Sequence, residues 1–234
     1  MAVIGSMWAR LGASVGACRR AHPSRGRCGR GRAPAAALVL LLLAPAAALA
    51  GSPTILVFGD SLSAAYGMDR DDGWPALLEE RLADQGYPHE VVNASRSGET
   101  TSGGERRLPD ALERHDPAVT ILQLGGNDGL RGQPPQRVED NLAAMIEAAQ
   151  GAGSEVVLVG IRIPPNYGQA YTERFEAVYP RLADAHGTRL VPFLLDGIWD
   201  REGMMQDDGI HPTAQAQPEL LDHVWAELEP LLDR

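Results

Sequence analysis

Lysine is absent from the 234-residue chain, whose 21 basic residues are all arginine. This absence excludes a phosphate-binding P-loop lysine, a Schiff-base lysine and a Ser–Lys catalytic pair. Cysteine is scarce, because the two cysteines, Cys18 and Cys28, both lie among the first 50 residues. The remaining chain therefore has no disulfide, no thiolate nucleophile and no cysteine-based metal site.

Long hydrophobic runs are also missing. The most apolar stretch, residues 33–50, is interrupted by Pro45 and falls short of the roughly 20 residues that a membrane span needs. It follows a segment with seven arginines and no acidic residue, and it ends in Ala48-Leu49-Ala50. This pattern predicts a secretory signal peptide over residues 1–50, with an uncleaved anchor as the alternative. We expect a periplasmic or secreted domain over residues 51–234, without a stable membrane anchor after cleavage.

The charge balance is strongly acidic once the leader is removed. The formal charge of −10 for the whole chain becomes −17, since 14 arginines then face 31 acidic residues. Such a domain should repel nucleic acid and anionic membrane surfaces. A chain of this length suits one domain with one core, and we expect a monomer that binds a small molecule.

Short apolar runs alternate with amphipathic ones after residue 53. The apolar runs are rich in β-branched residues, which is typical of strands buried on both faces of a parallel sheet. Glycines close several of the helical segments. The alternation predicts an α/β fold with five strands, over residues 54–58, 89–94, 118–124, 155–161 and 189–193, and with helices over residues 74–85, 102–115, 136–150, 171–186 and 213–232.

Polar residues follow the predicted strands, where ligands bind in open α/β sheets. The loop after the first strand contains Gly59, Asp60 and Ser61, without the glycine pattern of a dinucleotide site. A flavin phosphate site in a hydroxyl-rich loop is the alternative to catalysis here. We expect no cofactor and no metal.

Nucleophilic catalysis requires an activated hydroxyl group, a base and a group that orients the base. His211 lies in a loop before Pro212, and Asp208 precedes it by three residues, so a short turn can bring the carboxylate to the imidazole. The alternative is that Asp208 merely helps to start the last helix. The other histidines of the domain have ordinary positions at helix ends, within a helix or at the start of a strand: His89, His115, His186 and His223.

Donors for a developing oxyanion are also present after successive strands. Asn127 follows two glycines, Gly98 offers an unobstructed backbone N–H, and the Ser61 N–H should lie near the start of the first helix. Each residue taken singly fits an ordinary turn or polar loop equally well. Their joint placement at one edge of the sheet favours an acyl-transfer site.

The segments "FGDS", "NASRSG", "GGND" and "DGIHP" together resemble those of the GDSL-type, or SGNH, hydrolases. The resemblance covers residues 54–232 and is strongest to the bacterial periplasmic arylesterase and thioesterase I/lysophospholipase/protease I group. It implies a flavodoxin-like three-layer α/β/α sandwich with strand order 2-1-3-4-5. It further implies Ser61 as nucleophile, His211 as base and acid, Asp208 as orienting carboxylate, and Ser61, Gly98 and Asn127 as oxyanion donors. Asp60 would anchor the turn.

The resemblance also implies a serine esterase that forms an acyl-enzyme and acts on aryl and short to medium acyl esters, with activity on thioesters and lysophospholipids. Loops after the third and fourth strands should line the substrate pocket, through Gly129, Leu130, Ile161, Ile163, Pro164, Pro165 and Tyr167. Packing beneath a loop is the alternative for the residues of 161–168. A carbohydrate O-acetylesterase and a non-enzymatic binding domain are the alternative functions.

Overall fold

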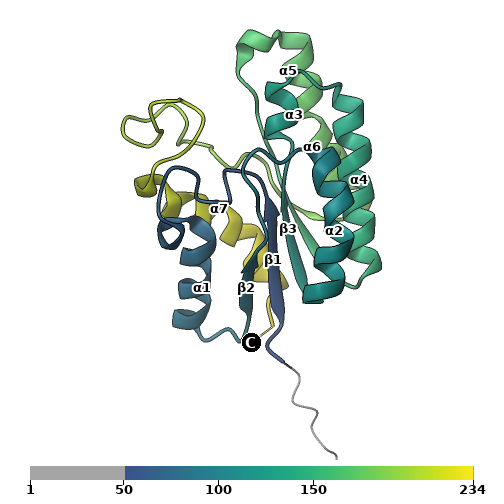
Figure 1. Cartoon of the computed structure of the whole chain (residues 1–234), viewed down its shortest axis with the longest axis vertical. Coiled ribbons are helices and arrows are strands. Elements are labelled where there is room, and N and C mark those ends of the chain that lie inside the picture. Colours follow the sequence, from purple (N-terminus) through teal and green to yellow (C-terminus); the bar gives the residue numbers. More distant parts are fainter. Residues whose placement is uncertain (1–50, 234) are drawn as a thin grey trace, which may run out of the picture. The chain divides into compact units, whose positions relative to one another are not determined.

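Five parallel strands form one sheet in the computed structural model of the chain, which describes residues 51–233 (Figure 1). The predicted signal peptide over residues 1–50 lies outside the described residues. The strand order β2-β1-β3-β4-β5 confirms the expected fold class and topology. The strands are β1 Thr54–Gly59, β2 Glu90–Asn93, β3 Val119–Gln123, β4 Glu155–Val159 and β5 Arg189–Val191.

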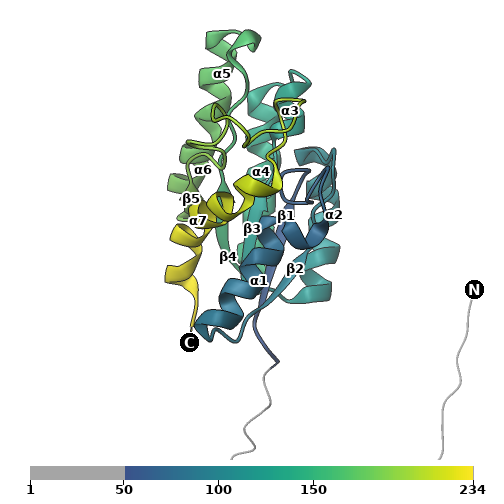
Figure 2. The same cartoon turned by 90° about the vertical axis from the view of Figure 1, so that its left-hand side faces the viewer.

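Helices cover both faces of this sheet, because alternate residues of each central strand point to opposite sides. In β1, Ile55 and Val57 belong to the core beneath α1 and α7, whereas Leu56 and Phe58 belong to the core beneath the remaining long helices. Figures 1 and 2 show these two layers on either side of the strands. The long helices are α1 Trp74–Gln85, α2 Thr101–His115, α4 Pro135–Gly151, α5 Gln169–Glu176, α6 Val178–His186 and α7 Gln217–Leu228.

Some predicted helices differ from those of the structure. The segment 171–186 is divided into α5 and α6. In one continuous helix, the ring of Pro180 would clash with the carbonyl group of Glu176, four residues earlier. The final segment consists of the short helix η3 (Ala214–Ala216), α7 and the short helix η4 (Glu229–Leu231). Residues Gly126–Leu130, expected to be a loop, form the short helix α3.

The carboxyl ends of the strands meet at one edge of the sheet, at the top of Figure 1. The loops after β1, β2 and β3 emerge there, and so does the segment that joins β5 to η3. The candidate site is therefore built at this edge. Among residues 51–233, no helix is both long and apolar enough to cross a membrane.

Candidate active site

Residues 59–67, here called the Ser61 turn, leave the end of β1 in a tight bend. A side chain on Gly59 would come within 2.6 Å of Gln123 Oε1 and 2.8 Å of Ser63 Oγ, so the close contact between β1 and β3 requires glycine. The Ala64 N–H donates to the Asp60 carbonyl group at 3.0 Å, which closes one turn. Ala65 then has a φ of +55°, a conformation that ends any helical continuation. The expected helix start at Ser61 is therefore wrong, since the first long helix begins at Trp74.

Residues 203–213, here called the His211 loop, carry the base and its carboxylate. Asp208 Oδ1 accepts the backbone N–H groups of Ile210 at 2.9 Å and His211 at 3.0 Å. Asp208 Oδ2 lies 2.6 Å from His211 Nδ1, and His211 Nε2 lies 2.9 Å from Ser61 Oγ. The structure thus brings the three residues together in the order that the sequence predicts, across 150 residues of chain.

Hydrogen bonding holds the pKa of Asp208 below its ordinary value. Partial desolvation alone would raise the pKa of this carboxyl group, but the backbone N–H of His211, its ring and the N–H of Ile210 lower the pKa to about 2. The carboxylate therefore stays ionised at neutral pH. An ionised acceptor keeps the proton of a neutral imidazole on Nδ1, which leaves Nε2 free to accept the Ser61 proton.

The three expected oxyanion donors lie on three separate elements. Asn127 is in α3, and its Nδ2 donates to the Glu99 carbonyl group at 3.0 Å. Gly98 has a φ of +79°, which glycine adopts without strain, and open space surrounds its Cα. The backbone N–H groups of Ser61 and Gly98 donate to no other group of residues 51–233. Both N–H groups are therefore available to an incoming oxygen.

Asp60 joins the Ser61 turn to the oxyanion side of the site. Its Oδ1 accepts the Leu62 N–H at 3.1 Å and Gln123 Nε2 at 3.0 Å, and its Oδ2 lies 3.5 Å from Asn127 Nδ2. Only 1% of Asp60 is exposed. Burial raises its pKa to about 6, although these hydrogen bonds and His211 oppose the rise. The predicted anchoring of the turn by Asp60 agrees with these contacts.

Asp128 is a buried residue that sequence reasoning missed. Its carboxylate accepts the backbone N–H of Thr101 at 2.9 Å and the Thr101 hydroxyl group at 2.8 Å, at the first turn of α2. Asn141 Nδ2 donates to the same hydroxyl group at 2.9 Å. The carboxylate thus ties α3, which carries Asn127, to the end of the loop that carries Gly98. The "GGND" motif contains Asp128, but only the fold shows its partner.

The expected substrate-lining residues fall into two groups. Ile161, Ile163 and Gly129 are buried: the two isoleucines belong to the core, and Gly129 packs against Ile163 and Phe175. The side chains of Ile161 and Ile163 thus pack beneath the loop, which is the alternative that the sequence left open. The other group reaches the surface: Pro164, Pro165 and Tyr167 are exposed, Leu130 is half-buried, and Tyr167 Oη donates to the Leu130 carbonyl group at 2.8 Å.

Tyr66 is a second residue that sequence reasoning missed. Its ring lies 4.3 Å from the His211 ring, centroid to centroid, with the planes tilted by 35°. Gln206 Nε2 donates to the Tyr66 carbonyl group at 2.8 Å and to the Pro212 carbonyl group at 3.0 Å. Gln206 therefore links the Ser61 turn to the His211 loop.

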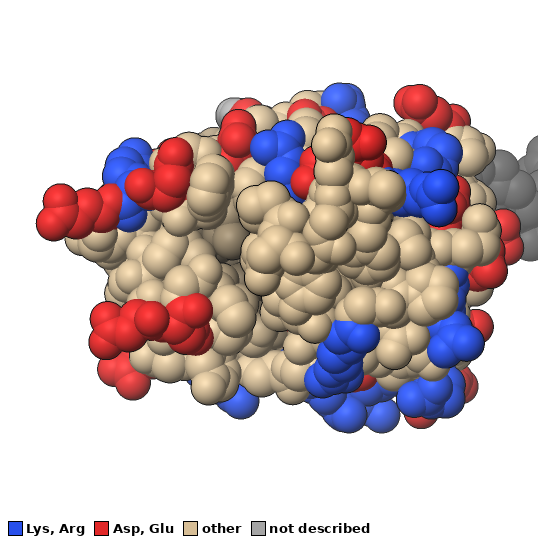
Figure 3. Space-filling model, turned by 90° about the horizontal axis from the view of Figure 1, so that it is seen from above, with Lys and Arg blue, Asp and Glu red and all other residues tan. Residues whose placement is uncertain are grey.

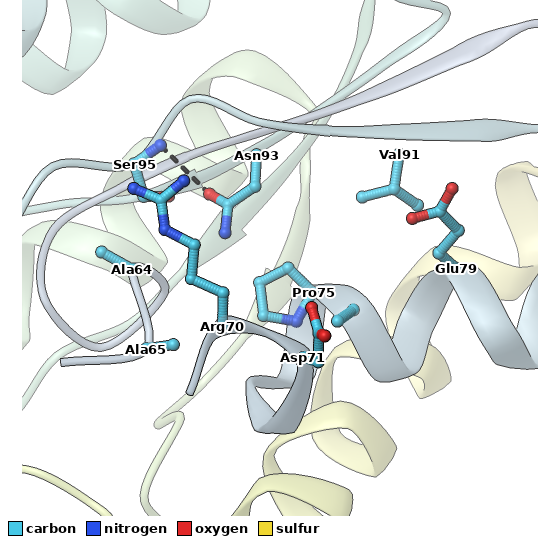
Figure 4. A pocket seen from close by; sticks show the side chains of 10 residues that line it. Ala64, Ala65, Arg70, Asp71, Pro75, Glu79, Val91, Asn93 and Ser95 are labelled. Atoms are coloured by element: carbon cyan, nitrogen blue, oxygen red, sulfur yellow. Dashed lines mark hydrogen bonds between the residues drawn. The ribbon is translucent and has the colours of Figure 1, made fainter. Parts of the chain in front are cut away.

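The surface around the site contains a separate hollow. A space of about 180 Å³ lies behind the Ser61 turn, between α1 and the end of β2, and Figure 4 shows Arg70 beside Asn93 and Ser95 in it. Neither Ser61 nor His211 lines this hollow. Figure 3 looks onto the carboxyl edge of the sheet, where uncharged surface fills the centre. Within residues 51–233, no cluster of three or more histidine, cysteine or acidic side chains could hold a metal ion.

The chain is similar to known proteins along most of its length. Residues 57–217 match the model of the GDSL-like lipase/acylhydrolase family. Esterase TesA of Pseudomonas aeruginosa is 52% identical over 195 residues, which are 83% of this chain and 96% of that protein. Thioesterase 1/protease 1/lysophospholipase L1 of Escherichia coli (strain K12) is 43% identical over 196 residues, which are 84% of this chain and 91% of that protein. A crystal structure of TesA superposes with a TM-score of 0.75 at 54% identity, covering 76% of this chain and 99% of that chain.

Proposed function

The chain belongs to the GDSL-like lipase/acylhydrolase family, and we propose that it hydrolyses carboxylic esters through an acyl-enzyme on Ser61. The observation that carries this proposal is the continuous contact from Ser61 Oγ to His211 Nε2 at 2.9 Å and from His211 Nδ1 to Asp208 at 2.6 Å. A hydroxyl group, a base and an orienting carboxylate in this order are the parts that nucleophilic acyl transfer requires.

The proposed reaction has two halves. In the first, Ser61 Oγ attacks the ester carbonyl carbon while His211 Nε2 takes the hydroxyl proton. The carbonyl oxygen becomes negative and accepts hydrogen bonds from the N–H groups of Ser61 and Gly98 and from the Asn127 amide. His211 then gives its proton to the departing alcohol oxygen. In the second half, water attacks the acyl-enzyme, His211 takes and returns a proton, and the acid and free Ser61 are released.

For substrates, we propose aryl esters and esters of short to medium acyl chains, together with thioesters and lysophospholipids. The names of two relatives, an esterase and a thioesterase/protease/lysophospholipase, support esters, thioesters and lysophospholipids as substrate classes. The exposed residues Leu130, Pro164, Pro165 and Tyr167 are the proposed contacts for the substrate. We also propose that the protein acts as a periplasmic or secreted monomer after cleavage of residues 1–50.

The decisive experiment combines turnover with covalent labelling. Purified protein is assayed with p-nitrophenyl esters of increasing acyl length and with acyl-CoA thioesters, and it is then treated with a fluorophosphonate probe and mapped by mass spectrometry. We expect turnover of the shorter esters and labelling at Ser61. Ser61→Ala should abolish both while the protein remains folded. Ser102→Ala, which removes a hydroxyl group in α2, is the matched control.

Three results would count against the proposal. Labelling at another residue, or an unchanged rate in Ser61→Ala, removes Ser61 as nucleophile. Turnover of acetylated sugars, with little activity on chains longer than about four carbons, would favour a carbohydrate O-acetylesterase, since a small pocket rejects added methylene groups. A folded protein that turns over none of these substrates would favour a binding domain.

A further inference from the structure

Few large apolar side chains remain exposed in the part of the chain that the structure describes. Within residues 51–233 they are Tyr66, Tyr167, Trp199 and Ile210, and each follows the carboxyl end of a strand. Two of the four adjoin the candidate base: Tyr66 is 48% exposed and contacts the His211 ring, and Ile210 is 41% exposed and precedes His211 in the chain. Apolar surface gathered beside a reactive group points to a ligand contact.

These two side chains are held by the hydrogen bonds that build the site itself. The carbonyl group of Tyr66 accepts from Gln206 Nε2, and the left-handed backbone of Ala65 directs the chain into this position. The N–H of Ile210 donates to Asp208 at 2.9 Å. Both residues are therefore held in place by the same segments that position His211. Their exposure is a property of the assembled site.

The position of His211 determines what these residues can contact. When His211 gives its proton to the departing oxygen, that oxygen must lie about 3 Å from Nε2. The carbonyl oxygen of the substrate is drawn instead toward Gly98 and Asn127, on the loops after β2 and β3. The alcohol part of an ester thus leaves on the His211 side, within reach of the Tyr66 ring 4.3 Å from the imidazole.

The charges on this side also restrict the leaving group. Residues 196–208 contain five acidic residues and one arginine, and no lysine balances them. Figure 3 shows carboxylates on the left of this face, where Figure 1 places both this segment and the turn after β1. These charges disfavour an anionic leaving group, such as the coenzyme A of an acyl-CoA thioester, relative to an uncharged one, without excluding it.

We propose that Tyr66 and Ile210 form the leaving-group subsite, and that it binds uncharged aromatic or other apolar alcohol parts of the ester. The proposal rests on the proposed function, since it assumes that His211 protonates the leaving oxygen. The apolar ring of Tyr66 would pack against an aromatic leaving group, and Ile210 would cover its edge.

A simpler role for Tyr66 makes a different prediction. A tyrosine ring beside the imidazole could act only by stabilising the protonated base, through cation–π attraction. Such a residue would support every ester equally, because every ester passes through the same protonated His211. Selectivity between leaving groups therefore separates a subsite from a residue that only supports the base.

The experiment compares phenyl acetate with methyl acetate in wild type, Tyr66→Ala, Tyr66→Phe, Ile210→Ser and Trp199→Ala. Both esters give the same acetyl-enzyme, and kcat/KM reports the steps up to its formation. In each variant, kcat/KM for phenyl acetate is divided by kcat/KM for methyl acetate. This ratio is then divided by the wild-type ratio, so that the intrinsic reactivity of the two esters cancels. Trp199 is the matched control, since it is an exposed aromatic residue with no ring contact to His211 in the described chain.

We expect Tyr66→Ala to lower the ratio about three- to tenfold, Ile210→Ser to lower it to a smaller extent, and Tyr66→Phe and Trp199→Ala to leave it near 1. A ratio near 1 in both Tyr66→Ala and Ile210→Ser would overturn the subsite, even if the overall rate falls. An equal loss in Trp199→Ala would also overturn it, because the effect would then be one of general surface hydrophobicity. A wild-type protein that hydrolyses neither ester would instead refute the proposed function.

Discussion

Burial of the Asp60 carboxyl group predicts a measurable change in stability with pH. The substitution Asp60→Asn preserves the shape of the side chain, and the amide oxygen can still accept from the Leu62 N–H and from Gln123 Nε2. The new amide N–H₂ group would face the N–H₂ group of Asn127. This contact between two donors destabilises the variant, but it does so equally at every pH. Only the pH dependence therefore reports the ionisation of Asp60.

The sign and size follow from the raised pKa. Burial raises the pKa of Asp60 from its ordinary value of 3.8 to about 6, so between these values the folded protein holds a proton that the unfolded chain has lost. Stability contributed by the protonated form is thus full below pH 3.8 and is lost as the pH rises through 6. Since one pKa unit corresponds to about 1.36 kcal/mol, wild type should lose about 3 kcal/mol relative to Asp60→Asn between pH 3.5 and pH 7.

The assay is urea unfolding of both proteins at several pH values across this range, with the free energy of unfolding extrapolated to water. The exposed Asp84→Asn is the matched control for the loss of one negative charge. His211 and Asp128 act on Asp60 electrostatically, so the comparison is repeated at high salt. Parallel stability curves for wild type and Asp60→Asn would refute the reasoning, because they would mean that Asp60 ionises freely in the folded protein.

The remaining predictions concern the base and the core. Asp208→Asn should keep its loop folded, because the amide oxygen can still accept the two backbone N–H groups. Its kcat on p-nitrophenyl acetate should nevertheless fall about 10³–10⁴-fold, because the amide N–H₂ donates to His211 Nδ1 and so forces the wrong tautomer on the ring. A loss below tenfold would contradict this. Thr101→Val should lower the free energy of unfolding by about 1–3 kcal/mol, because buried Asp128 loses a donor. Leu122→Ala should lower the free energy of unfolding by about 2–5 kcal/mol, because the Leu122 side chain is only 1% exposed in the sheet. Denaturant unfolding measures both changes, and a change near zero would contradict the corresponding prediction.

The strands were predictable because their signal is local, whereas their order in the sheet was implied by the resemblance to the GDSL-type hydrolases. Runs such as Ile55–Phe58 are buried on both faces, and the loops between them are too long for hairpins, so a parallel sheet follows. The placement of Ser61, Asp208 and His211 at one edge was predictable for the same reason, since parallel strands end on one side. Their contact distances were not, because these depend on how the His211 loop closes over the turn.

Other features required the fold. The sequence shows Asp128 and Thr101 as polar residues in separate loops, and only the packing of α2 against α3 brings them to 2.8 Å. Ile163 was expected to line a pocket because it follows a strand, but alternation along an extended loop directs it into the core and Pro164 to the surface. Tyr66 resembled an ordinary turn residue, because nothing in the sequence places a ring beside a histidine 145 positions later.

The site is thus built from two parts that are stabilised separately. Asp60, Gln123 and Asn127 form a network that joins the Ser61 turn to the oxyanion side, and its two buried members, Asp60 and Gln123, lie at the ends of the central strands β1 and β3. The His211 loop comes from the end of the chain and is tied to the Ser61 turn through Gln206 and the Ser61–His211 contact. Substitutions at Gln206 should therefore weaken the position of the base, together with the Tyr66 and Ile210 surface, without loosening the oxyanion donors. Under the proposed mechanism, selection among leaving groups can change with the His211 loop while stabilisation of the oxyanion stays with the sheet.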